Sequence, residues 1–376
     1  MNFDFPEDVL EMRHMVQRLA ERVGGTPQIL AAQELDAGFA PDTWQALSEL
    51  GLNSLLIDPD YQGAGLGSVA MGGLCEILGC HLLPSPFFAH AVLACDLLNR
   101  SQATTLKNRH LPAWATGEKL ATLALSQPGE GWNPNAVGGR LRQDGDQWWL
   151  DGRWGQVPHG AQADEIIVAA RAPNDELFLF LLLRSDLHCE PYETLDQTRR
   201  QARLSLDAFS VPESALIASG QEAENLITSC IDRATAALAC EQVGLAQACV
   251  DASVSYAKTR QQFGEVIGRF QAIKHLIADM YTQLEAARSA AYYALWCADH
   301  DHSHLPLAAA TAKTLATQAS FHCAGQNIQI HGGIGFTWEH AAHLYFKRAQ
   351  ANKNLLGTEH EHLERGAQLL GLTEAV

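Results

Sequence analysis

Two unusually long helical patterns in the second half of the chain limit its possible folds more than any other feature. Apolar residues recur with a helical period from about Leu226 to Thr259 and again from Gln271 to about His300, and a third pattern runs from Leu307 to about Gln329. Helices of globular proteins average only about 10–14 residues. Helices as long as these usually pack lengthwise against one another, so we expect a helical bundle.

The rest of the chain predicts a mainly α fold into which a small β domain is inserted. A helical period from Pro6 to Val23 opens a helical region. From Leu120 onward the pattern changes to short apolar runs divided by turn residues, and the run Leu177–Leu183 is typical of a buried strand. The dipeptides Asp144-Gly145 and Asp151-Gly152 are typical of hairpin turns. We therefore predict an N-terminal helical domain over residues 1–118, a β domain over 119–218 and a helical domain over 219–376.

Composition and charge exclude several classes of function. The net charge is −17 and Lys plus Arg number only 26, which argues against a nucleic-acid partner. No apolar run approaches the roughly 20 residues that span a membrane, and acidic residues stand where a secretory signal would be basic, so we expect a cytoplasmic protein. Nine scattered cysteines indicate reduced thiols. The His- and Asp-rich stretch 299–304 is interpreted as a solvated loop, and no metal site is predicted.

Two motifs in the second half resemble the signatures of the acyl-CoA dehydrogenase family. The first runs from Tyr256 to Gly264 (YAKTRQQFG) and continues as FQAIKH from Phe270. The second is QIHGGIGFT, from Gln329 to Thr337. The resemblance implies an N-terminal helical domain, a middle β-barrel and a C-terminal four-helix bundle.

The resemblance also implies a tetramer in which each FAD is shared between subunits. By position, Arg260 and Phe263 would reach the FAD of a neighbouring subunit, where the guanidinium would pair with the pyrophosphate. Gln329, Gly332 and Gly333 would contact the dinucleotide from the other side. Two alternatives stay open, because Arg260 can instead form a surface ion pair and the glycines can simply end a helix.

Other expected contacts with the cofactor lie at the β domain and near the C-terminus. The resemblance implies that Ser126 and Thr358 contact the FAD. Gln156 and Pro158 stand where many members of the family place a Trp and a Thr over the flavin ring. The mode of ring stacking in this chain is therefore open.

The family's proton-abstracting carboxylate is missing from both of its usual positions. Members of the family remove an α-proton from a CoA thioester while a hydride leaves the β-carbon for the flavin. The position before the Gly-Thr pair is Leu356 here, and the second known position is Ala234. Glu241, two turns beyond Ala234 on the same helix, is our candidate base, and the alternative is that its carboxylate pairs with an arginine. Asp232 and Glu359 are weaker candidates.

Three functions remain open from the sequence. The segment from His331 to Arg348 looks most like dehydrogenases of steroid side-chain catabolism, some of which are α2β2 complexes. The leading hypothesis is an acyl-CoA dehydrogenase subunit for a bulky CoA ester, in a homotetramer or an α2β2 heterotetramer, with an electron-transfer flavoprotein as electron acceptor. The alternatives are a non-catalytic structural subunit that shares an FAD site with its partner, and a helical ligand-binding protein without flavin.

Overall fold

The computed structural model describes residues 5–145 and 147–372. Its first part is helical, as the sequence predicts. The elements are α1 (Glu7–Val23), α2 (Thr26–Gln33), α3 (Pro41–Glu49), α4 (Gly67–Cys80), the π-helical segment η3 (Phe88–Cys95), α5 (Asp96–Arg100) and α6 (Thr104–Ala115), with short 3-10 turns at Leu52–Ser54 and Pro59–Tyr61.

A single eight-stranded sheet follows. Its strands are β1 (Ala121–Ala124), β2 (Gly139–Asp144), β3 (Gln147–Pro158), β4 (Glu165–Arg171), β5 (Leu177–Leu183), β6 (His188–Pro191), β7 (Gln201–Val211) and β8 (Leu216–Ser219). The order is β6-β7-β3-β2-β4-β5-β8, and β1 pairs with β4 in parallel. The predicted strand Leu177–Leu183 is therefore confirmed, and it pairs along its whole length with β4.

One of the two predicted hairpin turns is wrong. Asp151 and Gly152 lie inside β3, where Gly152 is paired with Gly139 on one side and Leu206 on the other. A Cβ atom at Gly152 would lie 2.4 Å from the carbonyl oxygen of Gly138. This glycine therefore permits a close approach of two strands rather than a turn.

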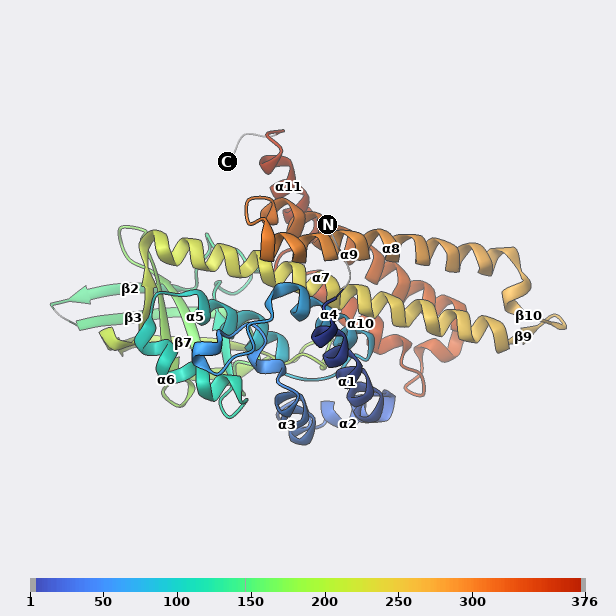
Figure 1. Cartoon of the computed structure of the whole chain (residues 1–376), viewed down its shortest axis with the longest axis horizontal. Coiled ribbons are helices and arrows are strands. Elements are labelled where there is room, and N and C mark those ends of the chain that lie inside the picture. The colour runs from blue at the N-terminus through green and yellow to red at the C-terminus, as the bar shows by residue number, and fades with distance from the viewer. Residues whose placement is uncertain (1–4, 146, 373–376) are drawn as a thin grey trace.

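The last part of the chain is the predicted bundle. Its long helices are α7 (Gly220–Thr259), α8 (Gln271–His300) and α9 (Leu305–His331), followed by the 3-10 turn η7 (Gly332–Phe336), α10 (Ala342–Asn352) and α11 (Glu359–Leu369). The short strands β9 (Gln261–Gln262) and β10 (Glu265–Val266) form a hairpin between α7 and α8. In Figure 1 this hairpin projects from one end of the molecule and the sheet lies at the opposite end.

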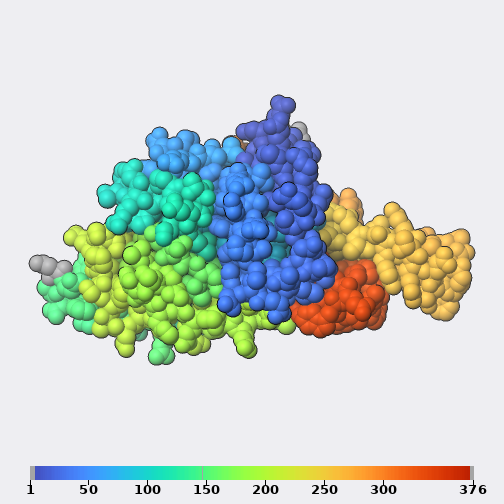
Figure 2. Space-filling model, turned by 90° about the horizontal axis from the view of Figure 1, so that it is seen from below, coloured from blue at the N-terminus to red at the C-terminus, as the bar shows by residue number. Residues whose placement is uncertain are grey.

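Helix α4 joins the N-terminal helices to the bundle through a close crossing with α7. A Cβ atom at Gly244 would lie 1.8 Å from the carbonyl oxygen of Glu76, and one at Gly79 would lie 2.1 Å from that of Glu241. Only glycine permits this approach at both positions. One core cluster consequently runs through the N-terminal helices and the bundle. Figure 2 shows the N-terminal helices (blue) beside the β domain (green), with the hairpin end of the bundle extending beyond both.

Every residue of α7 from Cys230 to Ala246 is buried. Polar side chains in such a stretch need partners inside the protein. All nine cysteines are free thiols, and most of them are buried. Within the described ranges, no helix has both the length and the hydropathy needed to cross a membrane.

Candidate functional site

The predicted hairpin residues lie at an exposed tip. Phe263 and Gly264 connect β9 to β10 and have φ angles of 56° and 81°, so the turn is left-handed at both residues. Phe263 is 92% exposed, and its ring lies edge-on to that of Phe270 with 6.2 Å between the ring centroids. Arg260 ends α7 and is exposed as well. Nothing in the folded chain requires an aromatic ring at this tip, which is consistent with a contact outside the chain.

The glycine motif lies beside the same end of α7. The His331 ring lies 4.3 Å from that of Tyr256, between ring centroids, which places the end of α9 against the end of α7. Gly332 ends α9 with a φ of 66° and ψ of −143°, a conformation open essentially to glycine alone. A Cβ atom at Gly333 would meet no atom within 4 Å, so the chain itself does not demand glycine there. Gln329, one turn earlier, is exposed at this same end.

The remaining predicted contacts lie near the β domain. The hydroxyl of Ser126 is buried and donates to the carbonyl oxygen of Asn133 at 3.0 Å. Thr358 caps α11, since its hydroxyl donates to Glu361 Oε2 at 2.8 Å and accepts from the Glu361 amide. Gln156 has a φ of 53° and lines a cavity of about 490 Å³.

The structure therefore divides the predicted cofactor residues into two groups. Arg260, Phe263 and the glycine motif lie at the hairpin end of the bundle, whereas Ser126 and Gln156 lie at the sheet end (Figure 1). One chain does not bring the two groups together. The contact of Arg260 and Phe263 with the FAD of a neighbouring subunit stays a prediction.

Both usual base positions are apolar and packed into the core. Ala234 is 0% exposed and Leu356 is 2% exposed. Leu356 has a φ of 59°, and its carbonyl oxygen accepts a hydrogen bond of 2.8 Å from Nε2 of His362. Burial lowers the pKa of His362 to about 4, so this imidazole is neutral at pH 7. The backbone loop at 355–357 is thus held in place without any group that takes a proton at residue 356.

Two cavities lie on either side of this loop. Leu355 lines the cavity of about 490 Å³ that also contains Gln156. Leu356 and Gly357 line a second cavity, of about 580 Å³, between the loop around Trp132, α7 and α11. The indole N–H of Trp132 is buried there and has no partner in the part of the chain that the structure describes. The loop therefore stands between two spaces, as a loop between cofactor and substrate would.

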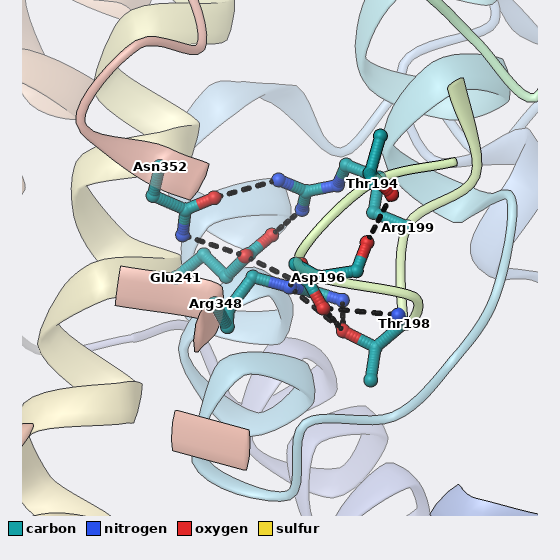
Figure 3. Close-up of polar contacts among 7 residues, drawn as sticks. All are labelled: Thr194, Asp196, Thr198, Arg199, Glu241, Arg348 and Asn352. Atoms are coloured by element: carbon teal, nitrogen blue, oxygen red, sulfur yellow. Dashed lines mark hydrogen bonds and ion pairs between the residues drawn. The ribbon is translucent and has the colours of Figure 1, made fainter. Parts of the chain in front are cut away.

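Glu241 is buried, and both of its oxygens are bonded (Figure 3). Oε2 accepts from Nη2 of Arg199, and Oε1 accepts from Nη1 of Arg348 at 3.0 Å and from Nδ2 of Asn352 at 3.1 Å. Burial alone would raise the pKa of Glu241, but Arg199 and then Arg348 bring it below its ordinary value. A carboxylate that two guanidinium groups keep ionised is a poor proton acceptor. The geometry favours the ion pair, and the role of Glu241 as base stays a prediction.

The ion pairs around Glu241 connect distant parts of the chain. Arg199 and Asp196 belong to the loop between β6 and β7, Glu241 belongs to α7, and Arg348 and Asn352 belong to α10. Arg348 Nε donates to Asp196 Oδ2 at 2.6 Å, and Arg199 Nη1 donates to Asn352 Oδ1 at 2.8 Å. Sequence reasoning missed these partners. The available signal was a carboxylate inside an apolar helical stretch, which requires a cation but does not say which one.

The other buried carboxylates are also bonded to basic side chains. Asp232, one of the weaker candidates, forms a two-pronged pair with Arg365 in which Nη2 lies 2.9 Å from Oδ2. Glu359, the other, is half-buried and accepts from Gln318. Six carboxylates are buried in the described ranges, and their partners are Arg288 for Glu76, Arg233 for Asp96, His110 for Glu165, Arg348 for Asp196, Arg365 for Asp232, and Arg199 and Arg348 for Glu241. No buried carboxylate among them is free to act as a base.

The His- and Asp-rich segment has a structural role in part. Asp299, near the end of α8, accepts from the backbone amides of Ser68 and Val69 at 2.8 and 2.9 Å, where α4 begins. His304 bonds to Asp301 within the exposed turn that follows. Among residues 5–145 and 147–372, no three His, Cys, Asp or Glu side chains gather as metal ligands do.

Comparisons with known proteins agree with the architecture. The model of the acyl-CoA dehydrogenase N-terminal domain matches residues 6–118, and the model of the C-terminal domain matches residues 225–370. The chain belongs to the acyl-CoA dehydrogenase family. The acyl-CoA dehydrogenase IpdE2 of Mycobacterium tuberculosis is 34% identical to it over 364 residues, which are 96% of each protein.

Two solved structures have the same fold as this chain. The ChsE4-ChsE5 complex from Mycobacterium tuberculosis contains a chain that matches with a TM-score of 0.90 at 24% identity, over 100% of both chains. A variant of the Tcur3481-Tcur3483 steroid ACAD matches with a TM-score of 0.88 at 28% identity, over 97% of this chain and 98% of that one. The resemblance found in the sequence motifs is thereby confirmed.

Membership of the acyl-CoA dehydrogenase family implies a flavin, and the cavity of about 490 Å³ fits a flavin ring chemically. Arg199 offers N–H donors there, and Gln201 offers a buried Oε1 that has no partner among the described residues. The pyrimidine edge of a flavin alternates carbonyl acceptors with an N–H donor and can use both kinds of group. Gly129 and Gly155 leave part of the wall without side chains.

Proposed function

We propose that the chain is a subunit of an FAD-dependent acyl-CoA dehydrogenase that desaturates a bulky CoA ester, and that a different chain of the same family supplies the base. The supporting observation is the set of buried carboxylates. Leucine and alanine occupy the usual base positions, and each of the six buried carboxylates is already bonded to a basic side chain. None of these six buried carboxylates is therefore free to accept an α-proton.

The proposal assigns this chain's own residues to binding and polarisation. FAD, when bound, accepts the hydride that leaves the β-carbon of the acyl group. The loop at residues 355–357 presents backbone between the two cavities, and the backbone amide of Leu356 remains available to donate to a thioester oxygen. Such donors stabilise the charge that develops on that oxygen. Polarisation of the substrate does not require a side chain at residue 356.

The hairpin end of the bundle supports a partner chain in this proposal. Arg260 and Phe263 are exposed there, far from this chain's own sheet (Figure 1). Guanidinium groups suit pyrophosphate, and an exposed aromatic ring gains from covering a planar group. We assign these two residues, with Gln329, Gly332 and Gly333, to an FAD whose ring lies in the neighbouring chain.

The partner and substrate classes rest on the relatives. IpdE2 is 34% identical to this chain. The names of the ChsE4-ChsE5 and Tcur3481-Tcur3483 structures each give two different proteins. A steroid-type CoA ester and an α2β2 assembly follow by analogy. An electron-transfer flavoprotein is the proposed electron acceptor, as in the family.

A second candidate is a self-sufficient homotetramer that uses Glu241. It requires substrate binding to displace Arg199 or Arg348 from the carboxylate. Removal of one partner from a buried ion pair costs about 3–5 kcal/mol, which makes this candidate the weaker one.

The experiment compares the chain produced alone with the chain produced together with an acyl-CoA dehydrogenase that has a glutamate before its Gly-Thr pair. FAD content per chain and dye reduction with a steroid-type CoA ester are measured in both preparations. Activity alone should be at least about 100-fold lower, since general-base catalysis contributes about 10²–10⁴-fold. Equal activity without the partner would contradict the proposal.

A further inference from the structure

We propose that Arg199 is a buried cation in the floor of the 490 Å³ cavity, where Arg199 and Gln201 hold the pyrimidine edge of the flavin and favour its reduced form. The Glu241 carboxylate bonds to Arg199 and offsets part of its charge. The inference rests on the proposed function in one respect, namely that a flavin ring occupies this chain's own cavity.

Arg199 is held on three sides. Nη1 donates to Asn352 Oδ1 at 2.8 Å, and Nη2 donates to Glu241 Oε2. The guanidinium carbon lies 4.9 Å from the centre of the Phe88 ring, which belongs to η3 of the N-terminal region. The β6–β7 loop, α7, α10 and η3 therefore fix one side chain jointly. Its position does not depend on a ligand.

The third nitrogen of Arg199 remains for a ligand. Nε makes no hydrogen bond to any part of the chain that the structure describes, and it is not among the side-chain atoms that are both fully buried and unbonded. Arg199 as a whole is only 8% exposed and lines the cavity. The cavity thus receives an N–H donor from a cation that water hardly reaches.

Arg199 shares its bonded carboxylate with a second cation in the floor of the cavity. Two cations, Arg199 and Arg348, are balanced by Asp196 and Glu241. Glu241 is shared, because one oxygen faces each arginine, and Asp196 pairs with Arg348 alone. Nearby His159 adds no charge at pH 7, since burial and then Arg199 lower its pKa to about 3. Glu241 therefore divides its negative charge between Arg199 and Arg348.

A fixed cation beside the pyrimidine edge has a definite effect on a flavin. Reduction increases the electron density of the ring, and a pre-oriented cation in a water-poor site stabilises that density without reorganisation. Gln201 complements it, because its buried Oε1 is an unpartnered acceptor in the same cavity. Arginine suits this role better than lysine, since its rigid fork can bond Glu241, Asn352 and a ligand at once.

The test measures the flavin midpoint potential of the complete FAD-loaded assembly by spectroelectrochemistry, with the variant in this chain only. Glu241→Gln keeps the shape of the side chain and an oxygen that can accept from Arg199, and it removes the negative charge that offsets Arg199, so the midpoint potential should rise. Arg199→Met removes the positive charge, so it should fall. A tenfold change in the preference for the reduced flavin corresponds to about 30 mV for a two-electron couple. Arg199→Lys should recover part of the loss.

The matched control is Glu76→Gln. Glu76 is also buried and bonded to arginines, Arg288 and Arg13, but it lines neither cavity beside residues 355–357. Its variant should leave the potential unchanged. General damage to the fold would move the two test variants in the same direction, so opposite shifts identify an electrostatic role.

The inference is overturned if the midpoint potential of every flavin in the assembly stays unchanged in both variants. It is also overturned if Glu241→Gln and Arg199→Met shift the midpoint potential in the same direction. If Arg199→Met does not fold, Glu241→Gln and Arg199→Lys still decide the sign. The wild-type comparison with and without partner tests the proposed function separately. An assembly that needs its partner's base but shows no shifted potential refutes only the role of Arg199.

Discussion

Lys313 makes the stability of this protein depend on pH in a way that one substitution can reveal. The side chain lies in α9 and is 0% exposed. Its Nζ donates to the carbonyl oxygen of Asn352 at 2.5 Å and to Thr317 Oγ1 at 3.1 Å, and no carboxylate bonds to it in the described ranges. Burial lowers the pKa of Lys313 from 10.5 to about 7, against the smaller opposing influence of Glu359 and Glu361.

The sign of the effect follows from proton binding. Between about pH 7 and 10.5 the unfolded chain holds a proton on Lys313 that the folded chain has lost, so stability rises with pH. The maximum slope is about 1.4 kcal/mol per pH unit. At pH 7, which is the pKa of Lys313 in the folded protein, the slope is about half of its maximum. The free energy of unfolding should therefore rise by about 2 kcal/mol between pH 7 and 9.

The assay is urea unfolding of the wild type and of Lys313→Met at pH 7, 8 and 9. A direct comparison of variants is needed because buried thiols act in the opposite direction. Burial raises the pKa of Cys230 to about 12, so its contribution to stability falls as pH passes the unfolded thiol value near 9. The difference between wild type and Lys313→Met cancels such terms. That difference should change by about 2 kcal/mol in favour of the wild type from pH 7 to 9.

The control is Lys258→Met, which removes an exposed lysine from α7. It should follow the wild type at all three pH values. A constant difference between Lys313→Met and wild type across this range would show that Lys313 is charged in the folded protein, and the argument from burial would fail.

Three further outcomes are expected. Ala234→Glu should lower the free energy of unfolding by several kcal/mol in thermal or urea melts, since Ala234 is 0% exposed and belongs to the hydrophobic core. Arg260→Ala should leave the melting of the chain unchanged and weaken FAD retention by about 10- to 100-fold in flavin fluorescence titrations, as loss of a charged hydrogen bond does. Gly333→Ala should also leave folding intact, because no atom lies within 4 Å of the new Cβ, while FAD occupancy of the assembly falls.

Local patterns in the sequence predicted most of the elements. Helix α8 has the predicted bounds, Gln271–His300, and β5 is the predicted run Leu177–Leu183. Both carry their signal in neighbouring residues, through a helical period or a continuous apolar run. Asp151-Gly152 was misleading for the same reason. Its dipeptide suggests a turn, but the strands that pair with it on either side are contributed by residues around 139 and 206.

Some features of the candidate site were visible in the sequence, and others were not. The two motifs and their order determined the family, because they depend on residues adjacent in the chain. The absence of a base at Leu356 and Ala234 was likewise visible in the sequence. The partners of Glu241 were not, since Arg199 and Arg348 are 42 and 107 residues away.

Only the tertiary structure shows which groups surround Glu241. A carboxylate in a buried helical stretch is equally compatible with a general base and with an ion pair, and its protonation depends on which charges surround it. Folding brings two guanidinium groups from different elements onto its two oxygens. It also separates the hairpin from the sheet by the length of α7, so one chain does not bring Arg260 and Phe263 to its own sheet. The sequence determines which groups are available, and long-range packing determines which of them meet.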